Sequence, residues 1–96
     1  MSDMFSWAKS FNQPIGKWNT QNVTKMGSMF YEAKNFNQPI ENWNTSKVTD
    51  MTGMFDGAES FNQPLNKWDV SRVMYMYCMF NGAKNFNLEN APWYHE

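Results

Sequence analysis

Catalysis would need a nucleophile with a general base beside it, and the only such combination that the residue types suggest is Cys78 with His95. They are the single cysteine and the single histidine of the chain. A nucleophilic cysteine needs a base close by, and His95 lies almost at the end of the sequence. A small, partly buried thiol is the competing interpretation, and one cysteine excludes an internal disulfide. We therefore expect no catalytic residues, with an enzyme based on Cys78 as the weakest alternative.

Methionines and tryptophans that recur at a fixed spacing offer two further kinds of chemistry. Thioether sulfurs of Met26, Met51 and Met76 could bind a soft metal, but such residues also fill cores against aromatic rings. Tryptophans could stack on sugars or bases, although inward packing is the simpler interpretation; a partly exposed edge would favour carbohydrate. No paired carboxylates, metal-ligand spacing or phosphate-binding glycine loop stands out. The sequence predicts no cofactor and no metal.

Composition narrows the class of protein. The 96 residues carry 8 basic and 9 acidic side chains, and no basic stripe of the kind that binds nucleic acid. No apolar run is long enough to span a membrane, and MSDMFSWAKS does not resemble a signal peptide. The length predicts one small domain.

A repeat of 25 residues organises all these columns. The phrases FNQPIGKWNT, FNQPIENWNT and FNQPLNKWDV occupy residues 11–20, 36–45 and 61–70. Apolar positions match between copies while polar positions change charge freely, which is typical of a solenoid. The sequence predicts a single repeat domain, 1–96, with a partial coil at 1–10, coils at 11–35, 36–60 and 61–85, and a partial coil or C-terminal cap at 86–96.

Spacing within one copy predicts its elements. After a possible N-cap at Ser46, the apolar residues Val48, Met51, Met54, Phe55 and Ala58 form one helical stripe. The corner 62–64 has turn chemistry, and alternation over 65–70 predicts a short strand. We expect an α/β fold of about four coils, each a strand plus a helix, with a parallel sheet on one face.

The pattern F-N-Q-P-(I/L)-x-x-W-(N/D)-(T/V)-S-x-V-x-x-M-x-x-M-F-x-x-A resembles the BspA-like repeats of surface proteins, which also occur in mycoplasma lipoproteins. The resemblance covers residues 1 to about 93 and departs from the pattern after Phe86-Asn87, where Gln-Pro is lost. It implies a right-handed, leucine-rich-repeat-like solenoid, a cell-surface or extracellular location, and an adhesive or antigenic role. The consensus residues carry the fold and no recorded active site.

The outward strand face is the predicted binding surface, and its partner would be a protein or a carbohydrate. Small polar groups on a rigid sheet can form many hydrogen bonds with a partner, although a plain solvated face is the competing interpretation. The alternative function is a structural subunit that assembles through the solenoid ends, because no N-terminal cap is visible. The candidate face consists of Lys17, Asn19, Gln21, Asn42, Asn44, Ser46, Lys67, Asp69 and Ser71.

Overall fold

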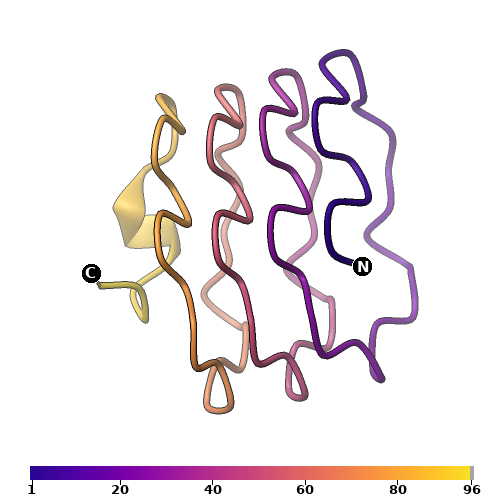
Figure 1. Cartoon of the computed structure of the whole chain (residues 1–96), viewed down its shortest axis with the longest axis vertical. Helices are drawn as coiled ribbons and strands as arrows, with labels where there is room; N and C mark the ends of the chain where they lie inside the picture. Colours follow the sequence, from indigo (N-terminus) through magenta and orange to yellow (C-terminus); the bar gives the residue numbers. More distant parts are fainter. Residues whose placement is uncertain (96) are drawn as a thin grey trace.

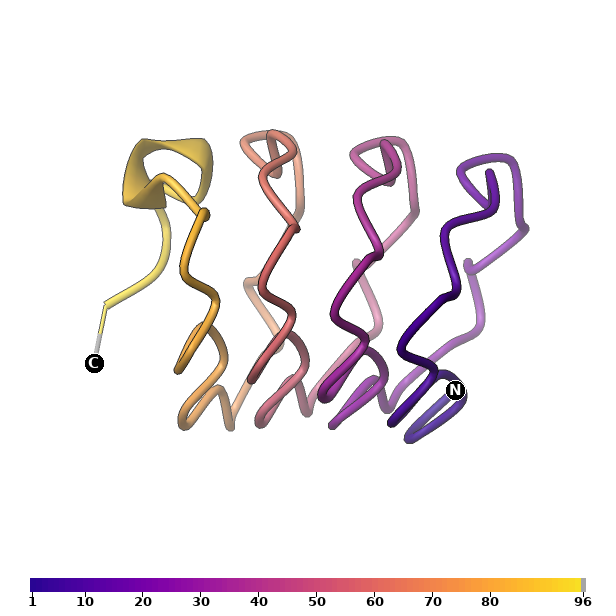
Figure 2. The ribbon, with the colours of Figure 1, turned by 90° about the horizontal axis from the view of Figure 1, so that it is seen from above.

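The computed structural model describes residues 1–95, which form coils stacked side by side along the chain (Figures 1 and 2). Each coil has two halves. The Met-Phe segments are residues 1–8, 26–33, 51–58 and 76–83, and the Trp segments are residues 11–20, 36–45, 61–70 and 86–95. The last predicted coil extends to Glu96, which lies outside the described residues.

The predicted right-handed α/β, leucine-rich-repeat-like architecture is wrong. Within residues 1–95 the only helix is the 3₁₀ helix η1 (Leu88–Asn90), and there is no sheet. Strand pairing is limited to isolated parallel bridges that join Lys25 to Asp50 and Asp50 to Tyr75. The coils therefore consist almost entirely of turns and irregular backbone.

The predicted helix over 46–58 fails because its backbone donors alternate between two kinds of acceptor. Met54 N–H donates to the Met51 carbonyl three residues back, whereas Phe55 N–H donates to the Met79 carbonyl of the next coil. Gly53 and Gly57 have φ of +61° and +77°, as at the third position of a type II turn, and an α-helix excludes such values. The apolar stripe is real, but successive turns produce it.

The predicted strand over 65–70 fails for a similar reason. Trp68 N–H donates to the Leu65 carbonyl at 3.1 Å, which closes a turn where an extended strand was expected. Val73 N–H closes a second turn on the Val70 carbonyl at 3.0 Å. Residues 67, 69 and 71 consequently do not lie along one flat face.

Two columns of phenylalanine rings form the centre of the core. Rings of Phe5, Phe30, Phe55 and Phe80 stack with centroids 5.5–5.7 Å apart. The second column is stacked at 5.8 Å and consists of Phe11, Phe36, Phe61 and Phe86. Met26 and Met51 have no exposed surface, as the core-filling interpretation predicts. Like residues stack on like residues, so each coil extends the same apolar layer.

The FNQP phrase forms a hydrogen-bonded corner between neighbouring coils. Asn62 N–H donates to Asn37 Oδ1 at 2.9 Å, and Gln63 Nε2 donates to the same oxygen at 3.1 Å. Equivalent bonds run from Asn37 and Gln38 back to Asn12. The repeated asparagines therefore satisfy backbone donors at each bend, so this column has a structural role.

Candidate functional site

A groove across the Trp segments brings together one column of the predicted binding face. Lys17, Asn42 and Lys67 line this groove, which has a volume of about 700 Å³ and crosses neighbouring coils. All three residues are exposed, and their side chains form no hydrogen bond with another residue in the range 1–95. They are therefore available to a ligand. We call this surface the corner groove.

The other six residues of the predicted face do not line the corner groove. The side chains of Asn19, Asn44 and Asp69 turn back onto their own backbone, as in an Asx turn. For example, Asn44 Oδ1 accepts hydrogen bonds from Ser46 N–H at 3.0 Å and from Ser46 Oγ at 2.6 Å. These side chains are committed to folding the chain, and Gln21, Ser46 and Ser71 occupy the same turns.

The sequence prediction missed most of the groove walls. Further lining residues come from the corners themselves: Pro14, Gly16, Trp18, Gln38, Pro39, Glu41 and Pro64. Trp18 is 41% exposed, although Trp43 and Trp68 of the same column are only 3% and 4% exposed. Each buried indole N–H donates to a carbonyl of the preceding coil, such as Trp43 Nε1 to Ile15 O at 2.9 Å. Trp18 is the first tryptophan of its column and is partly exposed. A partly exposed tryptophan edge is the feature that favours carbohydrate binding.

Local geometry keeps the corner groove open and its charges apart. A Cβ added to Gly16 would lie 2.6 Å from the Pro39 carbonyl oxygen, so only glycine permits the close approach of the first two corners. Glu41 Oε2 accepts a hydrogen bond from the backbone N–H of Lys67 at 3.2 Å. That bond orients the carboxylate and leaves the Lys67 ammonium free.

Asp69 shows why the column of Asn19, Asn44 and Asp69 has a structural role. Hydrogen bonds from the Ser71 side chain and then from the Ser71 backbone N–H lower the pKa of Asp69, and nearby Arg72 adds to this effect. A carboxylate held in this way stabilises the turn in its ionised form. It is a weaker candidate for ligand binding than the unbonded Lys67.

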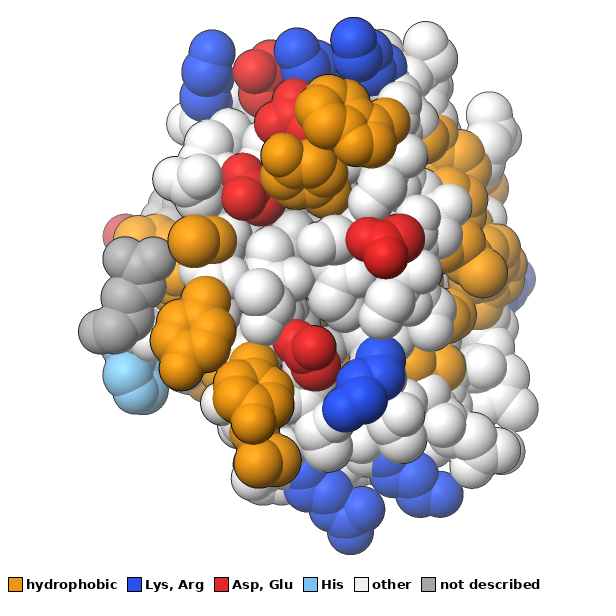
Figure 3. Space-filling view, in the orientation of Figure 1, with side chains coloured by type: hydrophobic (Ala, Val, Ile, Leu, Met, Phe, Trp, Pro, Cys, Tyr) orange, Lys and Arg blue, Asp and Glu red, His pale blue; other side chains and the backbone are white. Residues whose placement is uncertain are grey.

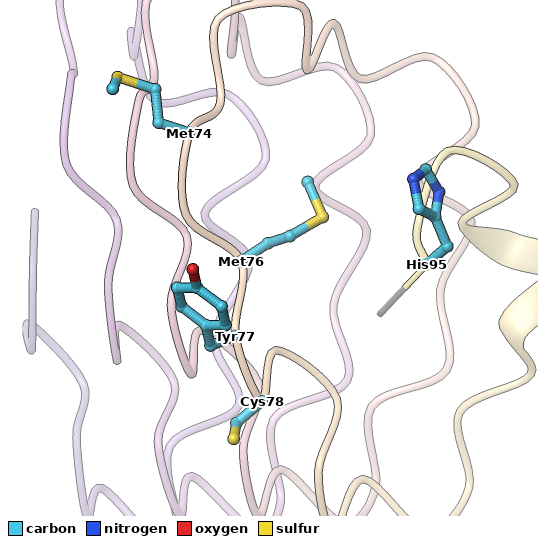
Figure 4. Close-up of a pocket in the computed structure, with 5 residues that line it drawn as sticks. All are labelled: Met74, Met76, Tyr77, Cys78 and His95. Atoms are coloured by element: carbon cyan, nitrogen blue, oxygen red, sulfur yellow. The ribbon is translucent and has the colours of Figure 1, made fainter.

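Cys78 and His95 both line a shallow pocket of about 300 Å³ at the C-terminal end, together with Met74, Met76 and Tyr77. Figure 4 shows that the Cys78 side chain points away from the His95 ring. Cys78 is an exposed free thiol. No hydrogen bond joins the Cys78 thiol to His95 within residues 1–95.

Residues 1–95 contain no group of three or more His, Cys, Asp and Glu side chains that could hold a metal ion. Over the same range, no helix has both the length and the apolar character needed to cross a membrane.

Fold and groove together define a repeat protein of stacked, irregular coils with an open polar and aromatic groove on one side. The chain belongs to the family described as "Mycoplasma protein of unknown function, DUF285", which it matches over residues 1–96. This match confirms the mycoplasma part of the resemblance inferred from the repeat. No curated protein and no solved structure matches the chain.

Proposed function

We propose that the chain is a non-enzymatic interaction module at a cell surface, as in BspA-like repeat proteins, and that it binds a glycan in the corner groove. The observation that carries this proposal is the column Lys17, Asn42 and Lys67. These unbonded, exposed side chains recur at the same place on successive coils and line one groove. Repetition along the stack suits a linear ligand with repeating units.

The groove supplies the groups that sugars need. The exposed indole of Trp18 offers a flat apolar surface on which the C–H face of a sugar ring can stack. Asn42 can both donate and accept hydrogen bonds, and the two lysines can donate to hydroxyl or carboxylate oxygens. The volume of about 700 Å³ lies within the range of about 300–1,000 Å³ that is typical of ligand sites.

A panel of purified neutral and carboxylated polysaccharides, read by calorimetry, tests the proposal. We expect at least one to bind, and Trp18→Ala and Lys67→Ala each to weaken that binding by about tenfold, equivalent to about 1.4 kcal/mol. Lys9→Ala is the matched control, because Lys9 is an exposed cation outside the groove.

Two outcomes would contradict glycan binding. One is an absence of binding across the whole panel, and the other is binding that Lys67→Ala leaves unchanged. Each variant must show the same urea unfolding midpoint as the native chain, so that a folding defect is not mistaken for a lost contact.

A further inference from the structure

Successive Met-Phe segments are joined by a backbone ladder with a fixed direction. At every internal junction, alternate N–H groups donate to carbonyls 24 residues further along the chain. The Phe30 N–H donates to the Met54 carbonyl at 2.8 Å, and the Phe55 N–H donates to the Met79 carbonyl at 2.9 Å. Donors thus face the C-terminal end of the stack and acceptors face the N-terminal end.

At the two ends of the stack, some backbone groups of this ladder have no hydrogen-bond partner within residues 1–95. At the N-terminal end, the carbonyls of Ser2, Met4 and Ser6 accept no hydrogen bond from a residue in the described chain. At the C-terminal end, the backbone N–H groups in the corresponding positions find no acceptor among residues 1–95; they belong to Cys78, Phe80 and Gly82. The ends therefore complement each other in both chemistry and register.

Apolar surface is exposed at the N-terminal end of the stack. Met4 is 52% exposed, whereas its column partners Met29, Met54 and Met79 have no exposed surface. Trp7 and Trp18, also within residues 1–20, are exposed too. Met74, Tyr75 and Tyr77 are exposed as well, but they stand in register with Thr49, Asp50 and Thr52 and so lie on a lateral face of the stack. Figure 3 shows hydrophobic side chains along the margin of the N-terminal coil and over the C-terminal side.

We propose that copies of this chain associate head to tail, so that one copy continues the stack of the next. The carbonyls of Ser2, Met4 and Ser6 of one copy would accept hydrogen bonds from the N–H groups of Cys78, Phe80 and Gly82 of the other. Such a contact is continuous with the internal junctions and repeats their geometry. It is also heterologous, so it extends without closing a ring.

Tyr94 limits this association. Its ring stands edge-on against Phe80, with centroids 4.9 Å apart and planes at 90°. Phe80 is the last ring of its column and yet is only 9% exposed. Tyr94 therefore covers the place where Phe5 of the next copy would stack, and the contact forms only when this ring moves aside. Removal of the Tyr94 ring should strengthen association, and replacement by another ring should not.

Sedimentation velocity over a dilution series tests the proposal with the native chain, Tyr94→Ala, Tyr94→Phe and the double variant Tyr94→Ala/Met4→Glu. We expect Tyr94→Ala to form dimers and longer species at concentrations where the native chain and Tyr94→Phe are monomeric. Met4→Glu places a charge among the unpaired carbonyls, so the double variant should be monomeric. A folded Tyr94→Ala that stays monomeric at all concentrations overturns the proposal, as does a double variant that still associates.

A mixing experiment tests the polarity of the contact. The native chain has an open N-terminal end, and the double variant has only its C-terminal end open. We expect an equimolar mixture to form a one-to-one complex and nothing larger. Absence of that complex, or a self-dimer of the double variant, contradicts head-to-tail stacking. Because Met4 lies outside the corner groove, failure here leaves glycan binding intact, and loss of glycan binding in Lys67→Ala leaves this result unaffected.

Discussion

Replacement of Gly53 by alanine gives opposite results for a helical repeat and for the turns described here. In an exposed helix interior, Gly→Ala stabilises by about 1 kcal/mol. Gly53 instead has φ of +61°, where a residue with a Cβ costs roughly 1–2 kcal/mol. The added Cβ would meet Ser28 Oγ at 3.5 Å and Asp56 Cβ at 3.9 Å, which are ordinary contacts, so the cost is one of backbone conformation.

The magnitude follows from two opposing effects. Alanine reduces the conformational entropy of the unfolded chain, which stabilises the protein by about 0.4–1 kcal/mol and offsets part of the left-handed penalty. We expect a net loss of about 1 kcal/mol and a fall in Tm of about 4–8 °C for a domain of this size. The control is Gly27→Ala, because φ at Gly27 lies outside the left-handed region and the nearest atom to the new Cβ, the Thr52 carbonyl oxygen, is 3.4 Å away.

Urea unfolding followed by tryptophan fluorescence measures both variants, with the slope m compared to confirm that the unfolded surface is unchanged. Gly27→Ala should be neutral or slightly stabilising. If Gly53→Ala proves to be stabilising, the turns assigned to residues 51–58 are wrong, and a helix in that segment becomes the better description.

Three further predictions concern the corners and the acidic residues. Asn37→Ala removes the oxygen that accepts the Asn62 N–H, so we expect the free energy of unfolding to fall by about 1 kcal/mol. Asn66→Ala is the control, because it alters an exposed side chain with no bond to another described residue. Its free energy of unfolding should change by no more than about 0.5 kcal/mol in the same assay. Burial raises the pKa of Asp56, so the folded state holds this proton more strongly than the unfolded chain does. The resulting stabilisation is fully present below the unfolded pKa and is lost as pH rises through the folded pKa. Asp56→Asn should therefore raise the urea midpoint at about pH 7 and leave it unchanged at about pH 3, and an equal rise at both values would contradict this reasoning. Hydrogen bonds lower the pKa of Asp69, so its contribution is present above the unfolded pKa and lost as pH falls through the folded pKa; Asp69→Asn should lower the midpoint at about pH 7, and no change there would contradict it.

Several features of the core could be predicted from the repeat because they depend only on which residue types recur. Met51 and Phe55 belong to the predicted apolar stripe, and neither has exposed surface. Turn chemistry was expected at the corner 62–64, and there the Asn62 N–H donates to Asn37 Oδ1. These predictions need only the rule that matched apolar residues stack and that a repeated bend must satisfy its donors.

The candidate site was predicted only in part, because side chains with the same spacing have different local partners. Lys67 and Asp69 both appear as outward polar residues in the sequence. In the structure Asp69 is bonded to its own turn, while Lys67 lines the corner groove. Trp18 is exposed because it occupies the first position of its column, which depends on the stacking order rather than on its residue type.

By itself, the sequence determined the period, the identity of the core columns and the corner motif, since all three follow from residue type and spacing. Only the tertiary structure decided the backbone conformation within each coil. The spacing of apolar residues over 51–58 fits a helix, but that spacing does not say where the backbone N–H groups find their acceptors. Stacking supplies alternate N–H groups with carbonyls 24 residues away, so the segment folds into turns and leaves the unused donors and acceptors at the two ends of the stack.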